Sequence, residues 1–198
     1  MNNQRSLIRV IQVVSVTLVV GFGLWVAGSG PKAPVRPPVK DQSARNHAPE
    51  FALKDSSGRI VHLSDYKGKV VLLDFWATWC GPCGIEIPWF VDFQRRFKDR
   101  GFEGLGVSMD DEGWKAIAPF VAEKKINYRI VLGDDKTSDQ YGGVEALPTT
   151  FVIDREGRIA STHVGLTSRK DFEDAIENLL EASNDVNAGA GAKRADGS

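Results

Sequence analysis

From about His47 onward, the chain alternates short apolar runs with clusters of polar and turn residues. The run 70–75 is almost continuously apolar and has strand length, which indicates a strand buried on both faces of a sheet. Two predicted hairpins surround the turns 54–58 and 154–157, where Gly58 suits a position that needs positive φ. The remaining strands are predicted over 51–53, 59–63, 104–107, 128–132, 150–153 and 158–164.

Between these strands, apolar residues recur at helical spacing, which predicts amphipathic helices. The expected helices cover 85–100, 112–124 and 168–182, with one or two helical turns over 137–141. Ser168 and Asp171 form a weak capping box at the start of the last helix. Strands and helices in this order predict an α/β fold in which helices flank a mixed central β-sheet.

The first 27 residues have a different pattern. Residues 1–9 are polar and include Arg5 and Arg9, whereas residues 10–27 are almost wholly apolar and uncharged. A helix of this length spans about 27 Å, close to the roughly 30 Å hydrocarbon core of a bilayer. We therefore predict a cytoplasmic leader followed by an uncleaved transmembrane anchor, because positive charge favours the cytoplasmic side. A cleaved signal peptide is the competing interpretation, since the small residues 27–29 fit a cleavage site.

Two further segments lack the apolar periodicity of a packed domain. Residues 28–46 are rich in proline, which predicts an extended, semi-rigid linker between the anchor and the domain. Residues 47–182 form the predicted globular domain. Residues 183–198 are rich in Asn, Gly and Ala and bury too little apolar surface to order themselves, so we predict a disordered tail.

Composition and charge narrow the possible partners. The chain is 42% hydrophobic and 26% charged, as expected for a chain with a buried core, and its formal net charge is −1. This balance provides no electrostatic basis for binding nucleic acid. The chain has 2 cysteines, too few for a scaffold held by disulfides. A single pair beside an anchor segment instead suggests an oxidising compartment.

Both cysteines, Cys80 and Cys83, lie in the stretch Trp-Ala-Thr-Trp-Cys-Gly-Pro-Cys that follows the predicted buried strand. A cysteine at the start of a helix ionises more readily, because the helix N-terminus favours negative charge. A structural disulfide is a weaker interpretation, since closing about four residues stabilises a domain by only about 2 kcal/mol. A zinc site is also weaker, because the remaining candidate ligands are the scattered histidines His47, His62 and His163. The pattern favours redox chemistry.

The stretch 75–83, followed by Pro88 and by Leu-Pro-Thr-Thr-Phe-Val-Ile over 147–153, resembles the thioredoxin fold. More narrowly, residues 47–182 resemble the membrane-anchored TlpA/ResA-like thiol-disulfide oxidoreductases. The hairpin before the first core strand and the insertion over 112–127 favour this branch over plain thioredoxin. The resemblance implies a thioredoxin fold with a mixed central β-sheet flanked by helices, an N-terminal β-hairpin and a helical insertion.

The resemblance also implies roles for the cysteines and their neighbours. Cys80 is expected to attack a substrate disulfide as a thiolate, and Cys83 is expected to resolve the mixed disulfide. Gly81 and Pro82 are expected to set the turn beside the sulfur atoms. Trp79 is expected to offer a flat apolar surface to a partner.

Four further residues are candidates for the site. Pro148 matches the cis-proline that faces the active site in this fold, and Leu147 is expected to pair its backbone with an extended substrate. Asp74 matches the buried aspartate of thioredoxins, and burial raises a carboxyl pKa so that the group can act as a general base toward Cys83. Glu86 matches an acidic residue that ResA-like proteins place near the active site. For Asp74 and Glu86 a solvent-exposed carboxylate is the competing interpretation.

The Gly-Pro dipeptide between the cysteines is that of thioredoxins, whose potential is near −270 mV, against about −120 mV for the oxidant DsbA. We therefore expect a reductant of protein disulfides that is held at the inner membrane by one span, with its domain in the periplasm or otherwise outside the cytoplasm. A membrane thiol-electron donor would regenerate it. The resemblance implies haem-site cysteines of apocytochrome c, in cytochrome c maturation, as one target. A copper-handling module that uses the cysteine pair is the alternative. We expect a monomer without a cofactor or a resident metal.

Overall fold

The computed structural model describes residues 40–192, with side chains over residues 40–182. The predicted leader, the predicted anchor over 10–27 and the predicted linker up to residue 39 lie outside the described residues, as do residues 193–198. Within the described part of the chain, no helix combines the length and the apolar content that a membrane span requires.

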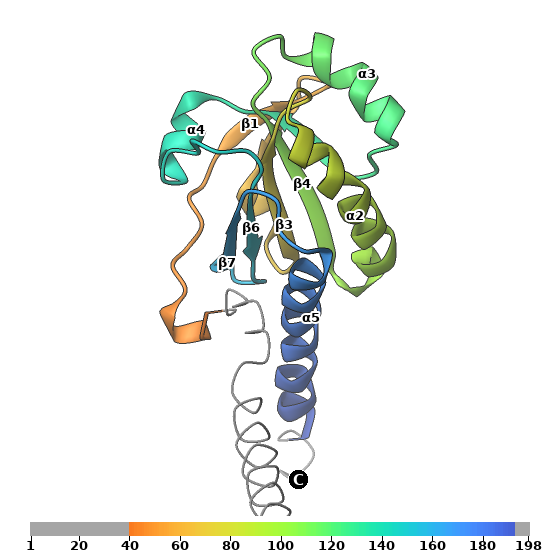
Figure 1. Ribbon diagram of the computed structural model, residues 1–198. Helices are drawn as coiled ribbons and strands as arrows, with labels where there is room; N and C mark the ends of the chain where they lie inside the picture. Colours follow the sequence, from red (N-terminus) through yellow and green to blue (C-terminus); the bar gives the residue numbers. More distant parts are fainter. Residues whose placement is uncertain (1–39, 193–198) are drawn as a thin grey trace, which may run out of the picture. The chain divides into compact units, whose positions relative to one another are not determined.

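A mixed β-sheet forms the centre of the domain. Its strands are β1 (Ala52–Asp55), β2 (Ile60–His62), β3 (Val70–Trp76), β4 (Phe102–Ser108), β5 (Arg129–Leu132), β6 (Thr149–Ile153) and β7 (Ile159–Val164). They form a 7-stranded sheet in the order β2-β1-β5-β4-β3-β6-β7 (Figure 1). Strand β4 pairs in parallel with β3 and β5, whereas β1–β2, β1–β5, β3–β6 and β6–β7 are antiparallel. The expected mixed sheet is therefore confirmed, and β3, which leads to the cysteines, lies inside it.

The α-helices of the described residues are α2 (Gly81–Phe97), α3 (Trp114–Lys124), α4 (Asp135–Gln140) and α5 (Arg169–Ala192). Short 3-10 segments cover Gln42–Ala44, Leu63–Tyr66 and Lys98–Arg100. Helices α2 and α5 lie side by side against one face of the sheet, while α3 is the predicted helical insertion between β4 and β5 (Figure 1).

Strand β3 contributes to two cores, because successive side chains of a strand point to opposite faces of the sheet. Leu72 and Trp76 pack with residues of α2 and α5 on one face. Leu73 and Phe75 pack on the other face with residues of β1 and the end of α4. The alternation places Asp74 on the face covered by α2 and α5, where every neighbouring position of the strand is buried.

The predicted strands are all present, with ends that differ by at most two residues. The helix expected over 85–100 begins earlier, at Gly81, and ends at Phe97. Cys80 caps it, and Pro82 fits the first turn because the N–H groups there have no partner within the helix. The cysteine pair is therefore part of the helix start.

The tail differs from its prediction. Helix α5 continues to Ala192, so the backbone of residues 183–192 is helical where we expected a disordered tail from Ser183 onward. The apolar stripe that ends with Leu179 and Leu180 is buried in the core. A helix anchored in this way can extend further, because adding a residue to an existing helix is far easier than nucleating one.

The end of the predicted linker also differs from its prediction, since residues 40–46 pack on the domain. The Lys40 N–H donates to Ala160 O (2.9 Å), and the Ile159 N–H donates to Asn46 O (2.8 Å). Arg45 forms an ion pair with the buried Asp154 at 3.0 Å. Strand β7 lies at the edge of the sheet, and its backbone groups need partners that residues 40–46 provide.

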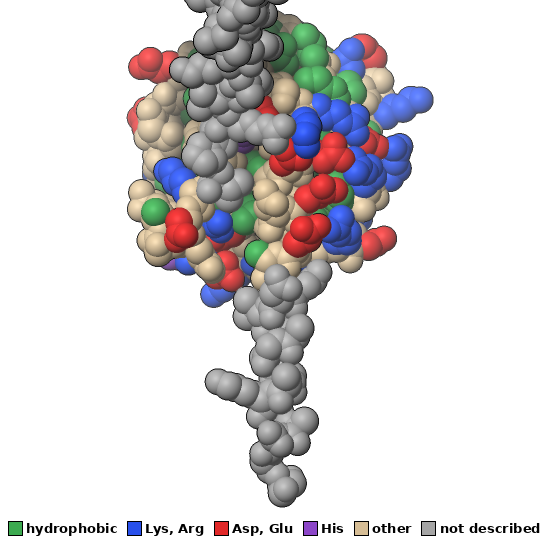
Figure 2. Space-filling model, turned by 60° about the horizontal axis from the view of Figure 1, so that its bottom comes forward, with side chains coloured by type: hydrophobic (Ala, Val, Ile, Leu, Met, Phe, Trp, Pro, Cys, Tyr) green, Lys and Arg blue, Asp and Glu red, His purple; other side chains and the backbone are tan. Residues whose placement is uncertain are grey.

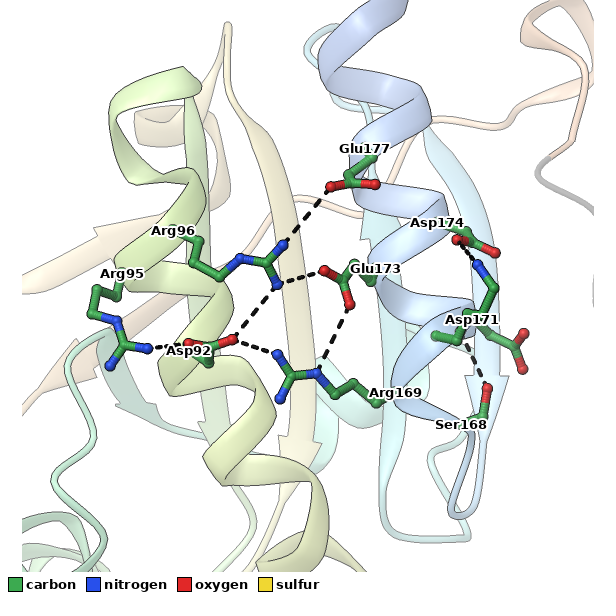
Figure 3. A network of polar contacts seen from close by, with 10 residues as sticks. Asp92, Arg95, Arg96, Ser168, Arg169, Asp171, Glu173, Asp174 and Glu177 are labelled. Atoms are coloured by element: carbon green, nitrogen blue, oxygen red, sulfur yellow. Dashed lines mark hydrogen bonds and ion pairs between the residues drawn. The ribbon is translucent and has the colours of Figure 1, made fainter.

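Charged side chains of both signs are interspersed on the face of the domain shown in Figure 2. One group of them bridges α2 and α5 (Figure 3). Arg96 lies 2.5 Å from Glu173, and Arg169 pairs with Asp92. Single exposed ion pairs stabilise little, but this network joins the helix that begins at the cysteines to the helix that closes the core.

Candidate active site

Cys80 and Cys83 form a disulfide with an S–S distance of 2.03 Å at the start of α2. Strand β3 ends at Trp76, and the loop 77–79 leads directly to Cys80, the N-cap of the helix. Cys80 is 6% exposed and Cys83 is 0% exposed. Cys80 is therefore the more exposed of the two cysteines, as its expected role as the attacking residue requires.

The Cys80 Sγ atom lies in the field of the helix N-terminus. The Cys83 N–H donates to it at 3.3 Å, and the first turn of α2 contains no acidic residue. After reduction, the same N–H group and the helix dipole favour a negative charge on this sulfur. The local structure thus stabilises the thiolate form of Cys80.

Asp74 is buried behind the cysteines in β3, with 1% exposure. The Thr150 hydroxyl donates to its Oδ1 at 2.9 Å from the neighbouring strand β6. Burial raises the pKa of Asp74 to about 8, the Thr150 hydrogen bond opposes this shift, and the nearby Glu86 adds to it. The structure excludes the exposed alternative for Asp74.

Glu86 is fully buried on the inner side of α2. The Thr167 N–H donates to its Oε1 at 2.8 Å, whereas its Oε2 is buried without a hydrogen-bond partner in the described part of the chain. Burial raises the pKa of Glu86 to about 7, and the Thr167 hydrogen bond lowers it. The structure excludes the exposed first-turn carboxylate and places a second titratable acid close to Asp74.

Pro148 lies at the same end of the sheet as the cysteines. The Leu147–Pro148 peptide bond is cis, as the resemblance implied. Pro148 directly precedes Thr149, which pairs with Phe75 near the end of β3. The Gly165 N–H donates to Pro148 O at 2.8 Å. Pro148 is buried, whereas Leu147 is partly buried.

The loop 165–167 joins two parts of the site, which sequence reasoning did not predict. Its Gly165 binds Pro148 and its Thr167 binds Glu86. Leu166 between them is 51% exposed, and no motif or periodicity marks it. The sequence does not reveal that this loop connects Pro148 and Glu86, because the residues involved lie far apart in the chain and meet only in the folded domain.

The remaining predicted residues lie around Cys80. Trp79 is 71% exposed, in agreement with an apolar surface beside the nucleophile. Gly81 and Pro82 are exposed in the first turn of α2. No group of three or more His, Cys, Asp or Glu residues within the described residues is arranged to hold a metal ion.

The chain matches the AhpC/TSA family over residues 44–162. It is 36% identical to the thiol-disulfide oxidoreductase ResA of Bacillus subtilis over 139 residues, which cover 70% of this chain and 76% of the relative. Among solved structures, it is similar to a thiol:disulfide interchange protein DsbE from Chlorobium tepidum, with 37% identity, a TM-score of 0.63 and coverage of 69% and 96% of the two chains. It is also similar to a DsbF homologue from Corynebacterium diphtheriae, with 26% identity, a TM-score of 0.66 and coverage of 77% and 98%.

The match to the family covers more than half of the chain, and the cysteine pair occupies the active-site position of the fold. Relatives from two Bacillus species are both named thiol-disulfide oxidoreductase ResA. The chain belongs to the AhpC/TSA family of thioredoxin-fold proteins and is a thiol-disulfide oxidoreductase of the ResA type.

Proposed function

We propose that the protein is an extracytoplasmic, monomeric reductase of protein disulfides that works by dithiol exchange at Cys80 and Cys83. The observation that supports this most is the combination of a cysteine pair at a helix N-terminus, with Cys80 the more exposed of the two, and two buried acids of raised pKa. Cys80 provides the nucleophile, and the buried acids provide a proton acceptor for the second cysteine.

The reaction has two exchange steps. In the first step, the Cys80 thiolate attacks one sulfur of the substrate disulfide, and the other substrate sulfur leaves as a thiolate. In the second step, the Cys83 thiolate attacks Cys80 Sγ and releases the second substrate sulfur. The substrate gains two electrons, and the protein is left with the Cys80–Cys83 disulfide seen in the structure.

The second step requires Cys83 to lose its proton in a fully buried environment. Asp74 and Glu86 have pKa values of about 8 and about 7, so each can accept and return a proton near neutral pH. We assign Asp74 the role of general base toward Cys83, directly or through a water. Glu86 raises the pKa of Asp74 and shares its buried environment.

Substrates would approach over an apolar surface around Cys80. Three of the exposed large hydrophobic residues belong to segments at the site: Trp79 beside Cys80, Ile85 in the first turns of α2, and Leu166 in the loop bound to Pro148 and Glu86. This surface, defined as Trp79, Ile85 and Leu166, fits an uncharged, unfolded segment that flanks a disulfide. The backbone of Leu147 would pair with that segment.

The proposal also covers where the domain is held, what reduces it and which substrate it acts on. The predicted anchor over 10–27 and its linker would hold the domain at the outer side of the inner membrane, where a membrane thiol-electron donor would reduce it again. The similarity to ResA and the Gly-Pro dipeptide support a reducing role. Apocytochrome c, with its haem-site cysteines in an unfolded chain, is the substrate that fits the apolar surface best.

The test is to trap the mixed disulfide. In cells, a Cys83→Ser variant should accumulate a substrate covalently bound to Cys80, because the resolving thiolate is missing. A Cys80→Ser variant is the matched control and should trap nothing. Absence of any trapped protein with Cys83→Ser, or a measured potential above about −180 mV, would refute a reductase in this compartment.

A further inference from the structure

A third buried acid, Asp110, lies next to the loop that carries Cys80. It follows the end of β4 and is 5% exposed. The Thr78 N–H donates to both of its carboxylate oxygens, at 3.1 and 3.0 Å. The hydroxyl groups of Thr78 and Ser108 donate to it at 2.5 and 2.7 Å. Asp110 was not among the residues that the sequence motifs indicated.

These bonds fasten the loop before Cys80 to the end of β4. The Met109 N–H donates to Trp76 O at 2.8 Å, which ties the start of the same loop to the same strand end. The Cys80 N–H donates to Ala77 O at 3.2 Å and closes the loop into a turn. Asp110 therefore helps to hold Cys80 at the N-terminus of α2.

The charge of Asp110 acts close to Cys80. Thr78 is two residues from Cys80, and two residues of chain span at most about 7 Å. Within the described residues, the hydrogen bonds to the carboxylate all come from neutral donors. Another buried acid, Asp55, differs in this respect because it forms ion pairs with Arg59 and Arg129. Among residues 40–182, no Lys or Arg forms an ion pair with Asp110 as Arg59 and Arg129 do with Asp55.

The other acids around Cys80 differ from Asp110. Asp74 on β3 and Glu86 on α2 have raised pKa values, and neither accepts a hydrogen bond from the loop 77–79 within the described residues. Asp111 and Glu112 are exposed to solvent, which screens their charges. The first turn of α2 consists of Gly, Pro, Cys and Gly and contributes no charge.

We propose that Asp110 is a positioning residue that makes the dithiol more strongly reducing, because its negative charge disfavours the thiolate of Cys80. A dithiol whose thiolate is less stable gives up its electrons more readily, so the equilibrium moves toward the Cys80–Cys83 disulfide. This inference rests on the proposed reducing function. It explains why a buried acid, paired with no cation among the described side chains, is bonded to the loop that carries the nucleophile.

The first test is Asp110→Asn in the full-length protein. Asn keeps one oxygen for Thr78 and turns its amide toward the Ser108 hydroxyl oxygen, which can accept it. The thiol pKa of Cys80 should fall by about one unit. The reduction potential should rise by up to about 30 mV, the value that corresponds to a tenfold change in a two-electron couple. Both are measured on the purified protein without a protein substrate.

Thr78→Val separates charge from structure. The variant removes the Thr78 hydroxyl that donates to Asp110 but leaves the carboxylate itself. Because the negative charge of Asp110 is then less compensated, the thiol pKa of Cys80 should rise, whereas it should fall in Asp110→Asn. Loosening of the loop alone would move both variants in the same direction. Asp55→Asn is the matched control, because it changes a buried, hydrogen-bonded acid elsewhere and should leave the thiol pKa and the potential unchanged.

Shifts of the same sign in Asp110→Asn and Thr78→Val, or no shift in either, would overturn the proposal. If Asp110→Asn does not fold, the sign of the shift in Thr78→Val decides. A wild-type protein that reduces no protein disulfide would refute the proposed function instead, because the thiol pKa and the potential do not depend on a protein substrate.

Discussion

The Thr150 hydroxyl donates a 2.9 Å hydrogen bond to the buried carboxyl of Asp74, from one strand to the next. This bond is the only one that the Asp74 carboxyl receives from a side chain within the described residues, and it lowers a pKa that burial raises to about 8. Burial, one hydroxyl group and the nearby Glu86 thus together set the acidity of the proposed general base.

Replacing Thr150 by Val should therefore raise the pKa of Asp74 further, because the charged form loses its donor. We expect a shift of about one unit, measured by NMR titration of the Asp74 carboxyl carbon. Thr149→Val is the matched control: the Thr149 hydroxyl donates to Ala146 O, so its loss should leave the Asp74 titration in place. An unchanged titration in Thr150→Val would contradict the assigned hydrogen bond.

Asp74 should also make folding stability depend on pH. Its pKa is about 8 in the folded protein and near 3.9 in an unfolded chain, so the folded state binds more protons between these values. Its favourable contribution is complete below about pH 4 and is lost as pH rises to about 8. Relative to wild type, Asp74→Asn should gain about 2 to 5 kcal/mol in unfolding free energy between pH 4 and pH 9.

Urea denaturation of the disulfide form at the two pH values measures this gain. Asp55→Asn is the control and should lose the same unfolding free energy at both pH values, because hydrogen bonds from Ser57 lower the pKa of Asp55 and its stabilising contribution is already complete above about pH 4. An Asp74→Asn variant whose stability follows that of wild type at both pH values would show that Asp74 is not the titrating group.

Leu166→Ala should weaken the binding of protein substrates. Removing its exposed side chain should raise KM for a protein disulfide about 3- to 10-fold, a change of about 0.7 to 1.4 kcal/mol, while kcat stays the same. Reduction of a small disulfide, which does not reach the apolar surface, should stay unchanged. Ile60→Ala is the control, because Ile60 is 58% exposed on β2 at the far edge of the sheet. Equal KM values for wild type and Leu166→Ala would argue against the proposed surface.

Gly106→Ala should destabilise the domain, because Gly106 lies opposite Asp74 in the sheet and has no room for a side chain. An added Cβ would lie 2.6 Å from Ile130 Cδ1 and 2.8 Å from Trp76 Nε1. We expect a loss of about 1 to 3 kcal/mol in thermal or urea unfolding. Gly84→Ala in α2 meets nothing within 4 Å and should be neutral or stabilising. A neutral Gly106→Ala would mean that this region repacks easily.

The fold follows largely from local patterns. The apolar run over 70–75, the hairpin turns and the helical stripes depend on neighbouring residues, so the sequence alone indicated every strand. The structure differs from the predicted segment boundaries where packing outweighs composition. Residues 40–46 and 183–192 have few large apolar side chains, yet 40–46 bond to an edge strand and the backbone of 183–192 continues an existing helix.

By itself, the sequence determined the chemistry of the site and its scaffold: the spacing of Cys80 and Cys83, their place at a helix start, and the cis-proline position of Pro148. Those features are local in the chain. Only the tertiary structure decided which acids are buried and what binds them. Thr150, Thr167 and Thr78, which donate to Asp74, Glu86 and Asp110, are 76, 81 and 32 positions away from them, and burial and hydrogen bonding together set the acidity of a carboxyl group.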